Sequence, residues 1–384
     1  MRNFLVKLKE VLNKNFRGNA DKRFLVLSLT ISLPFIAILA INLYLYDPAQ
    51  LFHKPYWRLN TFFGDMRVSA QGIIDHYDFD SYIIGTSMLE NTLAKDANAK
   101  LGGKWVNISL SGSPFGTRAK ILEYLFAQQE PLAILYSLDL FYFNEAPSER
   151  TLSPFLYNST HLDDWRFYIN DRFVLCSLVW SRQKGCVGDK DKNIADSLVR
   201  WDLRDGNAFG IEEWLKRKDE KYYKELLQSI ISYKKSQNNM ISKALKSTIK
   251  QRVQRQIFHF VAKHPNTQFY FVIPTYSRLH YKLGGEESFG HFVEIFSWVV
   301  SELEKYPNAT LYGFDTLDYA DNIANYKDST HYNTDMNSMQ LDAIANKTHI
   351  ITPQNVESYF EIMEQKILDY DVEPLIKIAK EAGF

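Results

Sequence analysis

This chain lacks a net formal charge, because its 45 lysine and arginine residues balance its 45 aspartate and glutamate residues. A protein whose main partner is nucleic acid usually carries a basic excess that matches the phosphates. The balance therefore excludes nucleic acid as the main partner. The 384 residues, 46% of them hydrophobic, suffice for one large domain or two ordinary ones with a sizeable core.

Cysteine is scarce. Cys176 and Cys186 are the two in the chain, and their number and spacing do not match a structural zinc site. In an oxidising compartment they would form a disulfide, whereas in a reducing one they would stay two thiols. The sequence leaves both states open.

Metal ligands are not expected elsewhere either. Asp75, His76, Asp78 and Asp80 have the composition of a metal site, but we interpret them as a solvated approach to the strand that follows. We therefore expect no metal and no dissociable cofactor.

Charged residues are also missing from Phe24 to Tyr46, the one long apolar run in the chain. At about 1.5 Å per residue, a helix of this length crosses a hydrocarbon core of about 30 Å. The run is longer than the apolar region of a typical signal peptide, and no small-x-small cleavage site follows it. We expect an uncleaved transmembrane anchor over residues 24–46.

The flanks of this run predict its orientation. Residues 1–23 form a basic, amphipathic tail, and basic ends of spans stay in the cytoplasm. Residues 47–384 should then form a periplasmic or extracellular domain. We expect a single-pass protein of the cell inner (cytoplasmic) membrane.

Beyond the anchor, short apolar runs alternate with helical patterns, which is typical of a doubly wound parallel sheet with helices on both faces, an α/β fold. The expected strands are Tyr82–Ile84, Trp105–Ile108, Leu132–Tyr136, Gln268–Ile273 and Thr310–Phe314. The expected helices include one from Ser87 to about Lys100, then residues 117–129, 287–305 and 334–346, and two at the C-terminus. Residues 144–240 break the alternation, and we interpret them as a mostly helical insertion.

Residues suited to nucleophilic catalysis follow three of these strands. Ligands bind at the carboxyl ends of the strands in such sheets. Ser87 follows the first strand and supplies a nucleophile, while His331 and Asp328 follow the last and supply a base and the group that orients it. The backbone N–H groups of Ser87 and Gly112 would stabilise an oxyanion. Gly112 lacks a side chain, so its backbone can approach a ligand closely.

These segments resemble the blocks of the SGNH (GDSL-type) hydrolase superfamily. Gly85-Thr86-Ser87-Met88 is similar to the first block, the loop with Gly112 to the second, and Asp328-Ser329-Thr330-His331 to the last. The resemblance covers about residues 80–137 and 266–347. It implies a flavodoxin-like three-layer fold and a catalytic triad of Ser87, His331 and Asp328.

With its anchor, the chain is similar to envelope members of that superfamily such as DltD and the alginate acetylation proteins. Those proteins act beside a membrane-embedded acyltransferase of the MBOAT type. The resemblance implies that this chain transfers or removes an acyl group, most simply acetyl, on a cell-envelope glycan, with such an acyltransferase as partner.

One block departs from the family pattern. Where the family has Gly-x-Asn-Asp, this chain has Tyr136-Ser137-Leu138-Asp139, without the asparagine that donates to the oxyanion. Ionised Asp139 only accepts hydrogen bonds, so a third donor would come from the insertion, for example Asn144 or Asn170. The departure also favours an alternative, a catalytically silent SGNH-like scaffold or glycan-binding component of a membrane acylation complex.

Other residues have weaker signals. The strand-end loop with Tyr276, Arg278 and His280 is expected to contribute to substrate binding. Aromatic residues of the insertion suit either sugar stacking or a core, and we interpret them as core: Trp165, Tyr168, Trp180 and Trp201.

Overall fold

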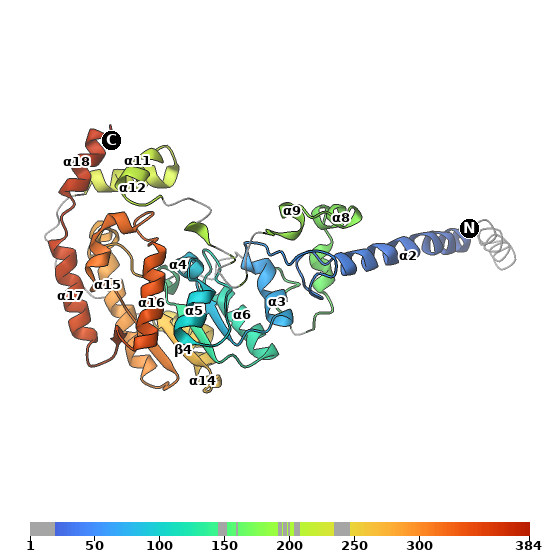
Figure 1. The fold of residues 1–384 in the computed structure, drawn as a ribbon, viewed down its shortest axis with the longest axis horizontal. Coiled ribbons are helices and arrows are strands. Elements are labelled where there is room, and N and C mark those ends of the chain that lie inside the picture. The colour runs from blue at the N-terminus through green and yellow to red at the C-terminus, as the bar shows by residue number, and fades with distance from the viewer. Residues whose placement is uncertain are drawn as a thin grey trace.

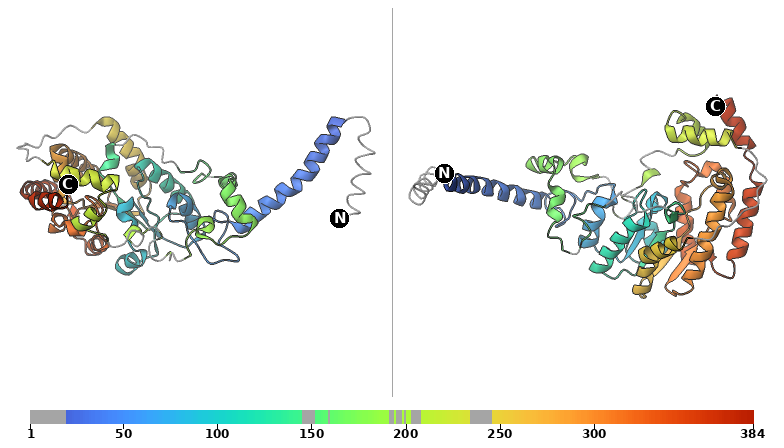
Figure 2. Two further views of the ribbon diagram at one scale, coloured as in Figure 1. Left: turned by 90° about the horizontal axis from the view of Figure 1, so that it is seen from above. Right: turned by 180° about the vertical axis from the view of Figure 1, so that it is seen from behind.

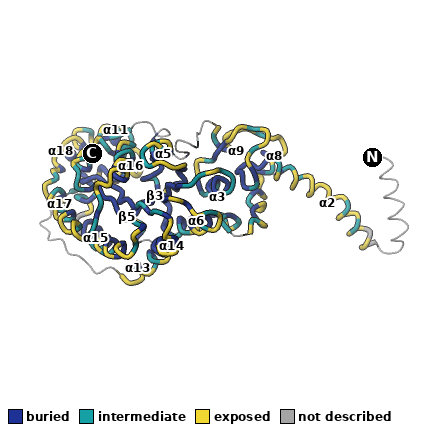
Figure 3. The backbone as a smooth tube through the Cα atoms, turned by 60° about the horizontal axis from the view of Figure 1, so that its bottom comes forward, coloured by how far each residue is buried: buried dark blue, intermediate teal, exposed yellow. Residues whose placement is uncertain are grey.

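The computed structural model describes residues 20–144, 152–158, 160–190, 194, 198, 200–202, 208–233 and 246–384. Most of the expected basic tail, residues 1–19, lies outside this set. The long helix α2 (Ala20–Tyr46) projects from one end of a larger α/β body (Figure 1). Its side chains are largely exposed until the last turns, as the yellow stretch of Figure 3 shows.

α2 is long and apolar enough over Phe24–Tyr46 to cross a membrane, and among the described residues it is the one helix that is. The expected apolar helix is therefore present. Its orientation across a membrane and the identity of that membrane stay predictions.

A six-stranded sheet forms the centre of the body, in the order β2-β1-β3-β4-β5-β6. The strands are β1 (Ser81–Ile84), β2 (Trp105–Asn107), β3 (Ala133–Ser137), β4 (Gln268–Val272), β5 (Ala309–Tyr312) and β6 (Ile350–Ile351). Each of the five expected strands is present within a few residues. β1 and β3 are buried along their whole length, as strands covered on both faces are.

The sheet is mixed rather than purely parallel, which corrects the expectation. The first five strands are parallel, but β6 pairs with β5 antiparallel, Tyr312 lying opposite Ile350. β6 has two residues, too few to show any hydrophobic period in the sequence.

Helices cover both faces of the sheet. The strand order reverses at β1, and because strand–helix–strand crossovers are right-handed, α5 (Ala94–Leu101) and α6 (Phe115–Gln128) lie on opposite faces. α16 (Thr334–Asn346) packs against α5. The π-helical turn η2 (Gln254–Phe258), between α13 (Ser247–Val253) and α14 (His259–Lys263), packs against α6, as does α3 (Met66–His76).

Two helix predictions had wrong boundaries. The helix expected from Ser87 to Lys100 is two helices, α4 (Ser87–Glu90) and α5, because the buried Asn107 side chain donates to the carbonyls of Leu89 and Thr92 between them. The helix expected at 287–305 is α15 (Arg278–Leu303), which begins at the capping Ser277. Its glycines at 284, 285 and 290 are poor helix formers, yet its packing against α17 (Val356–Asp369) maintains the helix.

The expected insertion is divided between the two ends of the body. The described part near α2 contains η1 (Asp164–Tyr168), α8 (Asp171–Leu178) and α9 (Lys184–Val187). The part at the other end contains α11 (Ile211–Lys216) and α12 (Lys221–Ile231), which packs against α18 (Glu373–Glu381). Both views of Figure 2 show this separation. The insertion is therefore not one structural unit.

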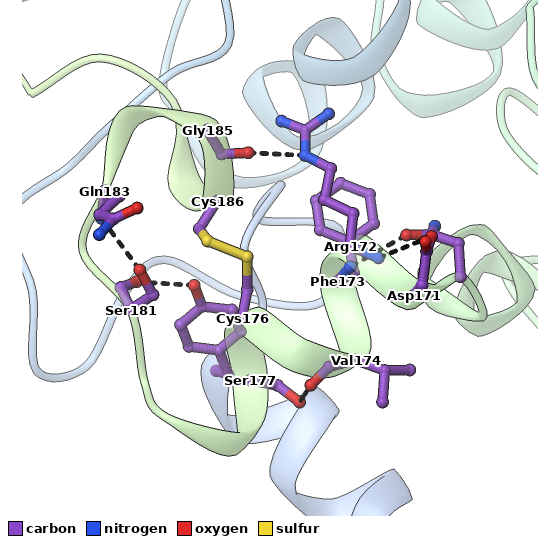
Figure 4. The surroundings of a disulfide bond; sticks show 12 residues. Asp171, Arg172, Phe173, Val174, Cys176, Ser177, Ser181, Gln183, Gly185 and Cys186 are labelled. Atoms are coloured by element: carbon purple, nitrogen blue, oxygen red, sulfur yellow. Dashed lines mark hydrogen bonds between the residues drawn. A yellow bond between two sulfur atoms is a disulfide. The ribbon is translucent and has the colours of Figure 1, made fainter.

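Cys176 and Cys186 form a disulfide between α8 and α9 (Figure 4). Beside it, the guanidinium Nε of Arg172 donates to the carbonyl of Gly185 at 2.6 Å. The disulfide resolves the alternative that the sequence left open, and it cross-links the part of the insertion next to α2.

Candidate active site

Ser87, His331 and Asp328 form a hydrogen-bonded chain at the carboxyl ends of the strands. Ser87 Oγ lies 2.8 Å from His331 Nε2, and His331 Nδ1 lies 2.8 Å from Asp328 Oδ2. With Nδ1–H donated to the carboxylate, Nε2 is left to accept the serine proton. The three side chains thus have the mutual geometry of a nucleophile, a base and its orienting group.

The turn between β1 and α4 positions the serine. Thr86 caps α4, accepting from the N–H of Met88, and Ser87 is the first residue of the helix. Gly85 is required before it, because a Cβ there would lie 2.8 Å from the side chain of Leu89. The tight turn directs Ser87 toward the loop that carries His331.

Asp328 also organises its own loop. Its Oδ1 accepts the backbone N–H groups of Thr330 and His331, each at 2.9 Å. The backbone N–H of Lys327 donates to the carbonyl of His331 at 2.9 Å and closes the loop. Asp328 therefore fixes the orientation of His331 through hydrogen bonds to both its backbone N–H and its ring.

The electrostatics suit this arrangement. Burial alone would raise the pKa of Asp328, but the charge of His331 and the hydrogen bonds from His331 and Thr330 outweigh it and hold that pKa well below its usual range. Burial would lower the pKa of His331, but the charge and hydrogen bond of Asp328 outweigh it, so the pKa of His331 is raised. Asp328 stays ionised and favours the imidazolium that a general base becomes.

The two reactive groups are accessible while the orienting group is not. The His331 side chain keeps 29% of its surface exposed, against 8% for Asp328. Ser87 is half-buried. A substrate can reach the hydroxyl and the imidazole without displacing the carboxylate.

The loop that carries Gly112 lies next to this turn. The backbone N–H of Leu110 donates to the carbonyl of Gly85 at 2.8 Å, and the N–H of Gly85 donates to Ser109 Oγ at 3.0 Å. Gly112 is half-buried with a φ of +59°, a conformation that favours glycine. The N–H of Ser87, in the first turn of α4, has no preceding helical carbonyl to bond. The loop that carries Gly112 is thus hydrogen-bonded to the turn before Ser87, and donation of the two N–H groups to an oxyanion stays a prediction.

Asp139 lies behind the nucleophile turn as an acceptor. Thr86 Oγ1 donates to Asp139 Oδ1 at 2.5 Å, and Ser137 Oγ donates to Oδ2 at 2.7 Å. Arg118 Nη2 lies 3.4 Å from Oδ2, and its guanidinium lies over the ring of Tyr136. Arg118 and Asp139 are both buried. This buried network supports the turn before Ser87.

Of the two insertion residues expected as a third oxyanion donor, Asn170 makes other hydrogen bonds. Asn170 caps α8, accepting from the N–H of Phe173 and donating to the carbonyl of Phe167, so that expectation is wrong for Asn170. The side chain of Asn144 lies outside the described residues.

Two of the three expected substrate-binding residues are buried instead. Arg278 is fully buried, with Nε 2.8 Å from Asp321 Oδ1 and Nη2 donating to the carbonyl of Asp315. Tyr276 is buried as well. Neither side chain is open to a substrate, which corrects the expectation, because α15 begins inside the core and its first residue, Arg278, makes structural hydrogen bonds there.

His280, the third, is half-buried and stacks edge-on against the exposed ring of Phe141. Burial lowers its pKa to about 4, against the raising influence of Asp328. His280 is therefore neutral at physiological pH. Substrate contact through His280 stays a prediction.

Trp201 is the residue of the site that the sequence did not reveal. Its indole N–H donates to the carbonyl of Ser87 at 2.8 Å, and its ring meets that of His331 edge-on at 5.6 Å. The ammonium of Lys327 lies 4.8 Å from the ring centroid. Trp201 is buried, as expected of a core residue. Its buried position lies directly against Ser87 and His331. No local motif marks it, because it reaches the site only through the fold of the insertion.

Among the residues that the structure describes, no group of three or more histidine, cysteine, aspartate or glutamate side chains is placed to hold a metal ion. Asp75 accepts the hydroxyl of Tyr124 at 2.7 Å, and Asp80 accepts the backbone N–H of Lys104 at 2.8 Å. The acidic cluster before β1 thus makes structural hydrogen bonds.

No model of a known protein family, no curated protein and no solved structure matches this chain. The resemblance to the SGNH superfamily therefore depends on the residues of the chain itself.

Proposed function

We propose that this chain is a membrane-anchored, SGNH-like serine acyltransferase or esterase that acts on acyl groups, in the simplest case acetyl, of a cell-envelope glycan. The observation that carries the proposal is the hydrogen-bonded chain from Ser87 through His331 to Asp328. Its members come from two distant segments, and each occupies the position that its role requires.

In the proposed mechanism, Ser87 Oγ attacks the acyl carbonyl carbon while His331 Nε2 takes the hydroxyl proton. The tetrahedral intermediate collapses, the leaving oxygen receives that proton from His331, and an acyl ester remains on Ser87. A second hydroxyl then repeats the steps in reverse. A glycan hydroxyl completes transfer, and water completes hydrolysis.

Oxyanion stabilisation in this proposal comes from the N–H groups of Ser87 and Gly112. Asp139 cannot donate while ionised, and it already accepts from Thr86 and Ser137. Loss of one donor typically costs about 10²–10³ in rate. We therefore propose slow acyl transfer in preference to rapid general hydrolysis.

The anchor supports the choice of substrate and partner. If α2 crosses the membrane with its basic flank inside, the site lies where envelope glycans are, whereas acyl-CoA is cytoplasmic. The acyl group would then be passed outward by a membrane-embedded acyltransferase of the MBOAT type, which we propose as the partner.

The test is labelling of the full chain in detergent with a fluorophosphonate probe, which reacts with activated serines. We expect labelling of the wild type, loss of labelling in Ser87→Ala and in His331→Ala, and unchanged labelling in Ser111→Ala. Ser111 is an exposed serine of the neighbouring loop and serves as the matched control. Labelling that persists in Ser87→Ala would refute the assignment of the nucleophile.

A second function, a catalytically silent scaffold or glycan-binding component, is favoured by one observation. The buried Leu138 stands where the third block of the family has its oxyanion asparagine. This function predicts a folded wild type without labelling, and envelope acylation that the Ser87→Ala chain restores in cells lacking the protein.

A further inference from the structure

The end of α2 is enclosed by the disulfide-linked part of the insertion, away from the triad. α8 packs along the last turns of α2 (Figure 1). Leu43 of α2 and Phe173 of α8 belong to one small apolar cluster. Two hydrogen bonds join α2 to the segment that follows α8: Trp180 Nε1 donates to Asn42 Oδ1 at 2.7 Å, and Tyr46 Oη donates to the Ser181 carbonyl at 2.7 Å.

This packing gives the insertion a defined depth relative to the anchor. A helix over Phe24–Tyr46 is 23 residues long, which exceeds by a few residues what a hydrocarbon core of about 30 Å requires. Asn42, Leu43 and Tyr46 then lie at the outer end of the span. An element that packs sideways against them lies at the same depth, in the interface between acyl chains and headgroups.

The exposed side chains at the C-terminal end of α8 are apolar. Leu175, Leu178 and Val179 are 63%, 61% and 74% exposed. Tyr56 and Trp57, from the connector after α2, are also exposed, and the Trp57 ring lies 5.3 Å from that of Trp180. We call these five exposed residues (Tyr56, Trp57, Leu175, Leu178 and Val179) the juxtamembrane surface.

Basic groups border the juxtamembrane surface. Arg182 donates to the carbonyl of Trp57 at 3.0 Å, and Arg58 and Arg182 line a small hollow with Tyr56, Trp57 and Trp180 beside the end of α2. Tryptophan and tyrosine with nearby arginine are the residues that membrane interfaces favour. Contiguous apolar residues left in water would instead favour aggregation.

We propose that the juxtamembrane surface lies in the bilayer, at the headgroup–acyl boundary of the leaflet that α2 leaves. The inference depends on α2 crossing a membrane, but not on the chemistry of the triad. The Cys176–Cys186 disulfide closes α8 onto α9 and so holds the surface in shape. The domain would then touch the bilayer at two places, through α2 and through the juxtamembrane surface. These two contacts would fix its distance from the membrane and its tilt, which a flexible linker alone would not.

The test places a genetically encoded fluorescent amino acid at one position at a time in the full chain, leaving the disulfide intact. The positions are Ile36 in the middle of α2, Leu178 and Val179 in the juxtamembrane surface, and Leu368 as the matched control. Leu368 is 52% exposed on α17, at the far end of the body (Figure 1). The protein is reconstituted in phosphatidylcholine vesicles brominated either near the headgroup or deep in the acyl chain.

We expect loss of most of the fluorescence at 178 and 179 with shallow bromines and little with deep ones, since interfacial side chains enter about 5–10 Å. A probe at position 36 should be quenched most by the deep bromines, and a probe at position 368 should be quenched by neither the deep nor the shallow ones. Aqueous iodide that quenches probes at 178 and 179 as strongly as one at 368, while the probe at 36 is quenched by lipid bromines, would overturn the proposal by placing this surface in water. A probe at 36 that bromines do not quench would overturn it as well, by removing the span.

Discussion

Around Ser87 the chain buries polar and charged groups, whereas around α8 it exposes apolar ones. Arg118 and Asp139 are buried beneath the nucleophile turn and are paired with each other and with Thr86 and Ser137. On α8, Leu178 and other apolar side chains project outward from a small cluster.

The two regions meet different physical demands. The proposed catalytic chain, with its 2.8 Å contacts, requires rigid support, and the buried hydrogen bonds give this support because a buried polar group without a partner is costly. The region around α8 has too small a core to be stable by burial alone, so a disulfide and the contact with α2 stabilise it. Substitutions in one region should therefore leave the other region largely unaffected.

The largest expected effect is that of Ser87→Ala on activity. Loss of the nucleophile should reduce acyl transfer by a factor on the order of 10⁶, because nothing else attacks the carbonyl. Thermal unfolding should stay close to wild type, since the half-buried hydroxyl is not part of the buried network. A large drop in melting temperature would show instead that Ser87 is a structural residue, with Ser111→Ala as the reference.

Asp328→Asn should reduce activity by about 10⁴, because the amide no longer fixes the His331 tautomer or stabilises the imidazolium. In the wild type, activity should rise with pH through the raised pKa of His331, since the base must be neutral to accept a proton. In the variant this rise in activity should occur at lower pH, because the carboxylate that raises the pKa of His331 is gone. A pH–rate profile of kcat/KM measures both the loss of activity and the shift of this rise, and a rise that does not shift would contradict the assignment of His331 as the base.

Asp328 also links pH to stability. Its pKa is depressed in the folded state, so the stabilisation it gives is present above the ordinary carboxyl pKa and is lost as pH falls toward the folded value. Asp328→Asn should remove this acid sensitivity, as followed by denaturation at several pH values.

Asp139→Ala should destabilise the domain by about 3–5 kcal/mol, because it leaves the buried charge of Arg118 without its counter-ion, although the guanidinium still donates to the Ser137 carbonyl. Chemical denaturation measures the change. Asp78→Ala, which breaks an exposed pair with Lys104, is the control and should change stability little. Equal effects from both variants would argue against a special role for the network behind Ser87.

The smallest expected effect is that of replacing Cys176 and Cys186 with serine. Removal of this short cross-link should cost about 2–3 kcal/mol, confined to the region around α8. Hydrogen exchange should rise in α8 and α9 while fluorophosphonate labelling of Ser87 persists. Parallel loss of labelling would show that the two regions are one cooperative unit.

Much of this architecture follows from short-range patterns. The five strands from β1 to β5 are apolar runs between turn residues, and Phe24–Tyr46 of α2 is an uncharged run long enough to cross a membrane, so each is visible locally. Ser87, Asp328 and His331 are equally visible as residues at strand ends. Their proximity was predictable because the carboxyl ends of parallel strands meet at one edge of a sheet.

Other features were not visible because they join residues far apart in the chain. Trp201 contacts Ser87 and His331 through a segment with no motif, and Arg278 turned out to be buried only because α15 begins beneath the loop of Asp321. The antiparallel β6 is too short for any pattern to show it.

By itself, the sequence determined the apolar helix, the α/β alternation and the identities of the residues in the proposed triad, since each depends on composition or on spacing along a few residues. Tertiary structure alone decided the division of the insertion between two ends, the pairing of Cys176 with Cys186, the acceptor role of Asp139 and the placement of apolar α8 beside α2. The physical reason is that these depend on long-range packing, in which many weak contacts between distant segments must be satisfied together.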